Sequence, residues 1–160
     1  MTQWRTYFPQ ILLAILAFTF ITRIVRLTSP EVYVFDEVYH GITSKLIARN
    51  DPRAYEWWNA PVEENTAVDW LHPPLAKYTQ ATSMLVFGEN SFGWRFSSVI
   101  FGILTVWVTA KLAFTLFRDE RVALLSALFV SLDGLILTQS RIAMNDIHVT
   151  FLMILAVWMY

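Results

Sequence analysis

Long runs of apolar residues with almost no charge constrain this chain more than any other feature. Residues 7–22 carry no charged side chain, and two later runs are interrupted only by Lys111 and by Asp133. At a rise of about 1.5 Å per residue, runs of this length can cross the hydrocarbon core of a bilayer as helices. The pattern predicts an all-α integral membrane protein, with spans at about 8–27, 96–117, 122–140 and 147–160.

The composition supports a membrane protein and argues against other classes. Of the 160 residues, 56% are hydrophobic and 16% are charged, whereas ordinary soluble domains have about 25% charged residues. A net charge of −1 without a basic stripe argues against a nucleic-acid partner. Because cysteine is absent, disulfides and thiolate metal sites are excluded.

The first apolar run has two interpretations. It could be a cleaved signal peptide, or a helix that stays in the membrane. Arg23 and Arg26 stand where a cleavage site would be expected, and no small-residue cleavage pattern follows them. We therefore expect a retained first span.

The segment between the first two spans, about residues 28–95, is expected to form one large extracytoplasmic loop. Residues 37–48 have the apolar spacing of a short amphipathic helix. Residues 74–87 form a second candidate helix, too short to span, so an interfacial position is expected. The stretch 55–70, rich in tryptophan, is expected to lie along the interface.

The alternation of spans predicts which polar groups share a face of the membrane. If the three complete spans alternate in direction, the large loop, Arg95, Arg141 and Asp146 emerge on one side. The charged turn at 118–121 emerges on the other side. The positive-inside rule supports this only weakly, because the loop also carries basic residues, although long loops follow the rule less strictly.

Asp36 and Glu37 follow the first span and are the candidate catalytic residues. A carboxylate in a partly dehydrated site can accept a proton from a hydroxyl nucleophile. Because adjacent residues of a helix point in different directions, we expect one acid to react and the other to be held by the scaffold. The alternative is that both acids only complement the dipole of a helix N-terminus.

His40 lies four residues after Asp36, so the two side chains could share a hydrogen bond or a metal ion. Two ligands do not make a metal site, so no metal is assigned, and a divalent metal is left open. Asp146, at the mouth of the fourth span, and His40 are candidates for orienting an acceptor or a cation. Asp133 is a functional candidate as an intramembrane acid, or is satisfied by Lys111 or by the backbone near Gly134.

The run His72-Pro73-Pro74-Leu75-Ala76-Lys77 predicts an anion site. Pro73 forces His72 into an extended conformation, and Pro74 suits the first position of a helix. The free N–H groups at that helix start attract anions. A lysine in the first turn opposes the dipole, which is explained if a phosphate lies nearby. The alternative is a lysine that extends to lipid headgroups.

Together these motifs resemble protein O-mannosyltransferases and related membrane glycosyltransferases of the GT-C type. The resemblance covers nearly the whole chain, and it implies that residues 1–160 are part of one transmembrane domain. It rests on four runs of residues: Asp36-Glu37, the run from His72 to Lys77, Phe92-Gly93-Trp94-Arg95, and Ser140-Arg141-Ile142-Ala143-Met144-Asn145-Asp146.

The resemblance implies inverting transfer of a sugar, mannose in that family, from a polyprenyl-phosphate carrier to a hydroxyl of a protein Ser/Thr or of a lipid. The reaction would take place at the extracytoplasmic face of a prokaryotic plasma membrane. Asp36 is then the expected base, supported by Glu37. The residues expected at the donor phosphate are Lys77, His72, Arg141 and Arg95. The lipid-linked donor is a co-substrate, and no cofactor is predicted.

The length of the chain suggests further alternatives. The last apolar run still continues at Tyr160, so we expect an N-terminal portion that is inactive alone. A rival interpretation is a truncated, non-enzymatic membrane protein that uses the same anion pocket. A transporter is disfavoured, because no inverted repeat is found.

Overall fold

The computed structural model describes residues 3–58 and 60–160, and within these ranges the chain is helical, without strands. The elements are α1 (Gln3–Ile24), α2 (Glu37–Ala48), a 3-10 turn η1 (Pro52–Tyr55), α3 (Leu75–Phe87), α4 (Ser91–Phe117), α5 (Glu120–Leu132), α6 (Gly134–Gln139) and α7 (Asp146–Met159). The expected all-α class is confirmed for the described residues, and α2 and α3 match the two expected short helices.

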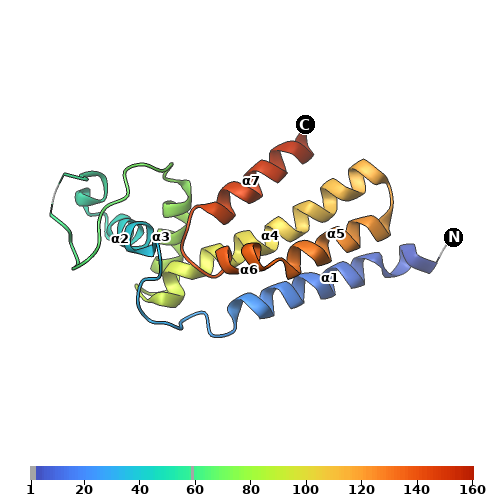
Figure 1. Ribbon diagram of the computed structural model, residues 1–160, viewed down its shortest axis with the longest axis horizontal. Helices are drawn as coiled ribbons and strands as arrows, with labels where there is room; N and C mark the ends of the chain where they lie inside the picture. The colour runs from blue at the N-terminus through green and yellow to red at the C-terminus, as the bar shows by residue number, and fades with distance from the viewer. Residues whose placement is uncertain (1–2, 59) are drawn as a thin grey trace.

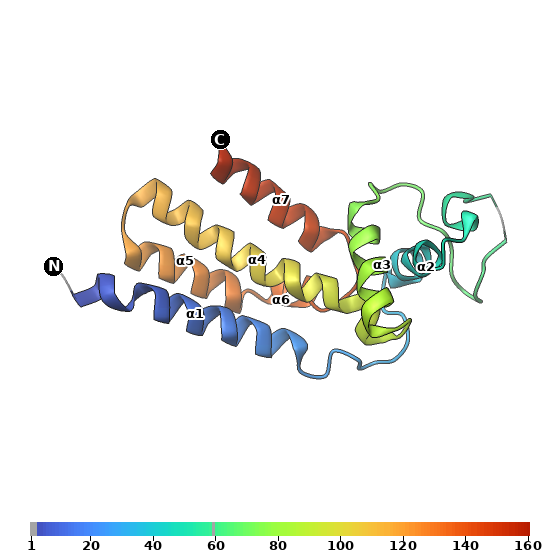
Figure 2. The same ribbon diagram turned by 180° about the vertical axis from the view of Figure 1, so that it is seen from behind.

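The long helices lie side by side, and the short helices of the loop lie at one end of them. Figure 1 shows α1, α4, α5 and α6 along the long axis, with the N-terminus at the end opposite α2 and α3. Figure 2, from behind, shows the same order, with α7 diverging from α4 towards the C-terminus. α4 packs against α1, α3, α5 and α7. The end of α1 and the starts of α4 and α7 therefore meet beside the loop.

The interface of α1, α4 and α5 is built from small and branched side chains. Leu12, Ile15, Val106, Ala110 and Ala127 form one buried cluster. The two alanines let α4 and α5 approach closely, as is common where helices pack in membranes.

The outer surface of the bundle is apolar. The segments Tyr7–Ile24 of α1 and Ser91–Phe117 of α4 are long and apolar enough to cross a membrane. Leu13, Leu116, Phe129 and Met153 are each at least 65% exposed. Apolar side chains exposed over several helices are expected where a bundle faces lipid.

The stretch expected as one span at 122–140 consists of two helices. Asp133 has an extended backbone between α5 and α6, and its carboxylate accepts a hydrogen bond from the Ile136 N–H at 2.8 Å. This is an N-cap, which satisfies a free N–H group of α6. Asp133 is therefore satisfied by the backbone beyond Gly134, the second of the two partners considered for it.

Two other helix boundaries also differ from expectation. α4 begins at Ser91 rather than at about 96, because the Asn90 side chain caps it by accepting from the Gly93 N–H at 3.0 Å. α1 ends at Ile24 rather than at 27, and Arg26 has a positive φ of 53°. The loop therefore begins and ends a few residues earlier than expected.

Candidate active site

Asp36 and Asp146 line one cavity at the loop end of the bundle. Its volume is about 610 Å³, and its wall comes from the start of α2, from His72, from α6 and from the start of α7. Asp36 is half-buried at the N-terminus of α2 and makes no side-chain cap hydrogen bond. Asp146 is exposed in the first turn of α7. Two carboxylates from distant parts of the sequence thus reach one space.

Glu37 does not line this cavity and is fully buried. Its carboxylate accepts two hydrogen bonds from Arg95, at 2.8 and 2.7 Å, and one from each of the Val34 and Ala143 N–H groups, both at 2.8 Å. All its lone pairs are used within the fold. Of the two candidate catalytic acids, Asp36 therefore lines the cavity, and Glu37 is held by the scaffold through Arg95 and two backbone N–H groups.

Arg95 is likewise committed to the fold and does not meet the cavity. It is 1% exposed. Besides the two bonds to Glu37, it donates to three carbonyls of the loop: Leu27 at 3.0 Å, Pro30 at 2.8 Å and Val32 at 2.9 Å. A guanidinium has five N–H groups, so none remains for a phosphate. The assignment of Arg95 to the donor phosphate is therefore wrong, because its N–H groups are bound to Glu37 and to carbonyls of the loop after α1.

Lys77 has an anion beside it, but that anion is Asp69. The Lys77 ammonium lies 2.8 Å from Asp69 Oδ2 and donates to the carbonyls of Asp69 at 2.8 Å and His72 at 3.0 Å. Its three N–H groups are thus used, and it is 3% exposed. The expectation of a phosphate at Lys77 is corrected, since the side chain turns inward to stabilise the proline corner.

Asp69 was missed by the sequence analysis. Burial acts to raise its pKa, but the hydrogen bonds from Lys77 and His72 outweigh burial and hold the pKa at about 2. The carboxylate is therefore ionised at neutral pH. The available signal was an acid three residues before His72, on the other side of the corner from Lys77.

His72 and His40 are both in the cavity wall. His72 Nδ1 lies 3.0 Å from Asp69 Oδ1, and half of its side chain is exposed. His40 is 3% exposed, and its ring meets that of His72 edge to face at 5.1 Å. Of the four residues predicted at the donor phosphate, His72 is the one that lines this cavity.

Arg141 caps the C-terminus of α1. It donates to the carbonyls of Thr22 at 2.7 Å, Arg23 at 3.0 Å and Val25 at 2.9 Å. A cation at the free carbonyls of a helix end is favourable. Arg141 is not in the cavity wall, so its expected role at the phosphate is replaced by a structural one.

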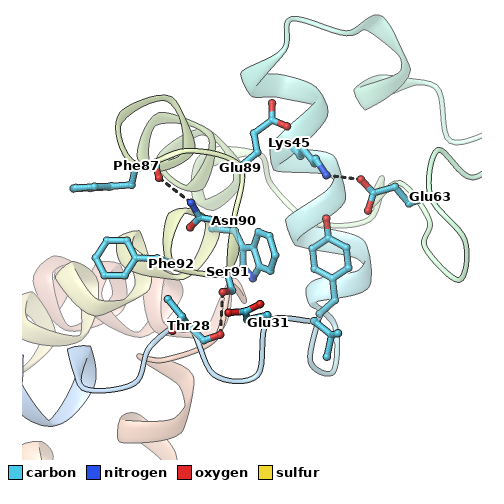
Figure 3. Close-up of a pocket in the computed structure, with 12 residues that line it drawn as sticks. Thr28, Glu31, Lys45, Glu63, Phe87, Glu89, Asn90, Ser91 and Phe92 are labelled. Carbon is cyan, nitrogen blue, oxygen red and sulfur yellow. Dashed lines mark hydrogen bonds and ion pairs between the residues drawn. The ribbon is translucent and has the colours of Figure 1, made fainter.

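A second, larger hollow of about 810 Å³ lies between the loop and the start of α4. Figure 3 shows its wall, with Lys45 paired to Glu63 and with the Ser91 hydroxyl donating to the Thr28 carbonyl. Glu31 and Glu89 add further carboxylates. This hollow shares no residue with the Asp36 cavity, and neither Asp36 nor Asp146 lines it. We therefore take the smaller cavity as the candidate site.

The fold and the cavity together define a class, that of helical membrane proteins with an acid-lined site at one end of the bundle. A family model for dolichyl-phosphate-mannose-protein mannosyltransferases matches residues 13–160. The chain belongs to this family, whose members are integral membrane proteins of the GT-C type.

Curated relatives agree with the family. A polyprenol-phosphate-mannose–protein mannosyltransferase of Corynebacterium glutamicum is 31% identical over 151 residues, 90% of this chain and 28% of that protein. The enzyme of the same name from Mycolicibacterium smegmatis is 31% identical over 147 residues, 89% of this chain and 26% of that protein. An undecaprenyl phosphate-alpha-4-amino-4-deoxy-L-arabinose arabinosyl transferase of Pseudomonas aeruginosa is 33% identical over 140 residues, 84% of this chain and 24% of that protein.

The chain thus spans less than a third of the length of these relatives. No solved structure matches it.

Proposed function

We propose that the protein transfers a sugar, mannose in the first instance, from a polyprenyl-phosphate carrier to a hydroxyl acceptor, with protein Ser/Thr as the acceptor class. The names of the relatives support a sugar donor linked to a polyprenyl phosphate. The assignment of the site rests on one observation: Asp36 and Asp146 line the same cavity, whereas the Glu37 carboxylate is bound in an ion pair with Arg95. This leaves Asp36 as the base, at the extracytoplasmic end of the bundle in a prokaryotic plasma membrane.

The chemistry needs one base and little else from the protein. The acceptor oxygen attacks the anomeric carbon as Asp36 removes its proton. The bond between that carbon and the phosphate oxygen breaks on the opposite face, so the configuration inverts. The carrier leaves as a phosphate monoester, a weak base that requires no general acid. Positive charge near the departing oxygens then lowers the barrier.

The test uses the full-length protein with a lipid-linked mannose donor and a Ser/Thr peptide. Asp36→Asn is expected to lower the rate of sugar transfer by several orders of magnitude while donor binding remains. Glu63→Gln is the matched control, because Glu63 lines the larger hollow and not the Asp36 cavity, and it should keep the wild-type rate. Full activity in Asp36→Asn would remove this residue as the base.

The arabinosyl transferase relative makes a different sugar the specific alternative. Competition between mannosyl and aminoarabinosyl donors in the same assay distinguishes the two. A lipid hydroxyl offered in place of the peptide tests the acceptor class. Donor binding without transfer to any acceptor would favour the non-enzymatic interpretation.

A further inference from the structure

The candidate site lacks an obvious source of positive charge for a phosphate. Arg95 and Lys77 have no free N–H group, and Arg141 caps α1. His72 remains, beside the carboxylates of Asp36 and Asp146. A phosphate among these carboxylates would meet net repulsion from the described side chains. A cation held in the cavity wall would offset this repulsion.

Three side chains in and behind the wall could supply metal ligands. His40 Nδ1 lies 2.9 Å from Asp69 Oδ2, and His72 Nδ1 lies 3.0 Å from Asp69 Oδ1. One ligand atom from each of the three residues falls within 4.8 Å of the others. Ligand atoms about 2 Å from one ion are separated by about 3 to 4 Å, so small side-chain movements suffice.

A second observation points to a ligand at this place. His40 Nδ1 is buried and has no hydrogen-bond partner, although Asp69 Oδ2 is so near. The short contact is therefore not aligned as an N–H donor bond, and a buried ring nitrogen without a partner is unusual. An ion between the two groups would satisfy the lone pair of the nitrogen and the charge of the carboxylate together.

The backbone around the three residues is built to hold them. The Asp69 N–H donates to the Thr43 hydroxyl at 2.8 Å, which ties the loop to α2 one turn after His40. The Leu71 N–H donates to Asp69 Oδ1 at 3.1 Å. Partners of this kind orient ligands in metal sites.

We propose that His40, Asp69 and His72 bind a divalent transition-metal cation, with Zn²⁺ as the ion that their two imidazoles and one carboxylate fit. Three protein ligands leave a coordination position open, as in catalytic zinc sites. Both histidines line the Asp36 cavity, so an ion held by them would lie in or directly behind its wall. The cation site rests on this geometry alone, and its use towards a phosphate rests on the proposed function.

The protonation states agree with metal binding. Burial lowers the pKa of His40, against a smaller opposing effect of the Asp69 charge, so the imidazole is neutral at neutral pH. A ligand imidazole must be neutral and a ligand carboxylate ionised. Asp69 meets the second condition, because, against the effect of burial, the hydrogen bond from Lys77 lowers its pKa.

Lys77 is the feature that opposes a cation here. Its ammonium contacts Asp69 Oδ2 and so weakens attraction of a second positive charge. The other oxygen, Oδ1, lies 3.0 Å from His72 Nδ1 and accepts from the Leu71 N–H. Lys77 also holds the backbone carbonyls of Asp69 and His72, which fixes two of the three ligands before any ion arrives. The expected consequence is a site of moderate affinity with a preordered shape.

The test titrates Co²⁺ into the full-length protein, purified in detergent and freed of metal with a chelator. We expect one equivalent to bind, visible d–d absorption to develop, and Zn²⁺ to displace it. His40→Ala and His72→Ala should each lower the affinity by at least about 10- to 100-fold, the loss that even outer partners of ligands cause. The control is His148→Gln, at the only other histidine of the sequence.

Absence of saturable Co²⁺ binding in protein that is folded by circular dichroism would overturn the inference. So would equal binding by the wild type and by both histidine variants. Sugar transfer by chelated protein, with no Co²⁺ binding, would overturn the metal site and leave the proposed function standing. Histidine-dependent Co²⁺ binding without sugar transfer from any donor would support the metal site and contradict the proposed function.

Discussion

Arg95 and Glu37 form a two-point ion pair that joins α4 to the start of α2, with Nε to Oε1 at 2.8 Å and Nη2 to Oε2 at 2.7 Å. The side chains are 2% and 0% exposed. Through their other bonds, the same two residues hold the loop after α1 and the connection before α7. The pair therefore fixes where Asp36 stands relative to the later helices.

Breaking this pair should destabilise the fold. Glu37→Gln leaves the Arg95 charge buried without its partner, and loss of one member of a buried pair costs about 3–5 kcal/mol. Unfolding of the purified protein in mixed micelles measures the change. The control Asp36→Asn should alter stability by no more than about 0.5 kcal/mol. An inactive Glu37→Gln with wild-type stability would contradict the structural role and return Glu37 to the reaction.

Arg95→Lys should lower the free energy of unfolding almost as much as removal of the charge would. Lysine offers three N–H groups in place of five and cannot reach Glu37 and three carbonyls together. We expect a loss of about 2–4 kcal/mol, composed of unsatisfied buried acceptors at about 1–3 kcal/mol each with partial relaxation. The same unfolding measurement checks it, and wild-type stability of the lysine variant would show that charge alone is sufficient.

Lys77→Met should destabilise the fold, because it leaves the Asp69 carboxylate, which is 8% exposed, without its ammonium partner. The expected loss is again about 3–5 kcal/mol. Adding Asp69→Asn removes the stranded charge, so the double variant should recover much of that loss. A double-mutant cycle of unfolding free energies gives the coupling. Additive effects of the two changes would show that the Lys77–Asp69 contact does not stabilise the corner.

Gly93 and Gly134 provide a matched pair of glycine-to-alanine tests. A Cβ at Gly93 would lie 1.9 Å from the carbonyl oxygen of Gly88, which is backbone and cannot move aside. At Gly134 a Cβ would meet nothing within 4 Å. We expect Gly93→Ala to cost about 1–3 kcal/mol and Gly134→Ala to be neutral or to stabilise by up to about 1 kcal/mol. Equal stability of the two variants would contradict the close contact of α3 and α4.

The helices and their order could be predicted because they depend on local spacing and on apolar length. α2 follows from periodicity and the start of α3 from the proline pair, and the gathering of Asp36 and Asp146 at one end follows from the alternation of spans. The break at Asp133 was harder to predict, because an apolar run does not show that one polar side chain will cap a new helix. Its extended backbone and its bond to Ile136 supply that information.

The roles of the basic residues could not be read from the sequence. Lys77 was placed at a phosphate because it lies in the first turn of a helix, and Arg95 and Arg141 because their positions along the chain put them on the same face. In the structure each turns towards an internal acceptor: Glu37, Asp69 or the carbonyls that end α1. The partner of a cation depends on side-chain direction and on contacts between distant residues, and the spacing of residues along the chain predicts neither. Asp69 was missed for the same reason.

The arrangement of the bundle predicts a labelling pattern in the membrane. The loop and the start of α7 lie at one end, and the turn before α5 lies at the other (Figure 1). The sequence has no cysteine, so single cysteines can be introduced without background from this chain. Glu64→Cys and Asp146→Cys should react with a membrane-impermeant maleimide on intact cells, because both positions are exposed at the loop end. Arg121→Cys should react only after permeabilisation.

Each variant should react fully in denaturant, which controls for an unreactive thiol. If position 121 reacted on intact cells together with position 64, the two ends of the bundle would share a compartment, and α4 would not span the membrane. If position 146 alone stayed unlabelled until permeabilisation, Asp36 and Asp146 would face different compartments. The cavity that brings them together, on which the assignment of the base depends, could then not form in the membrane.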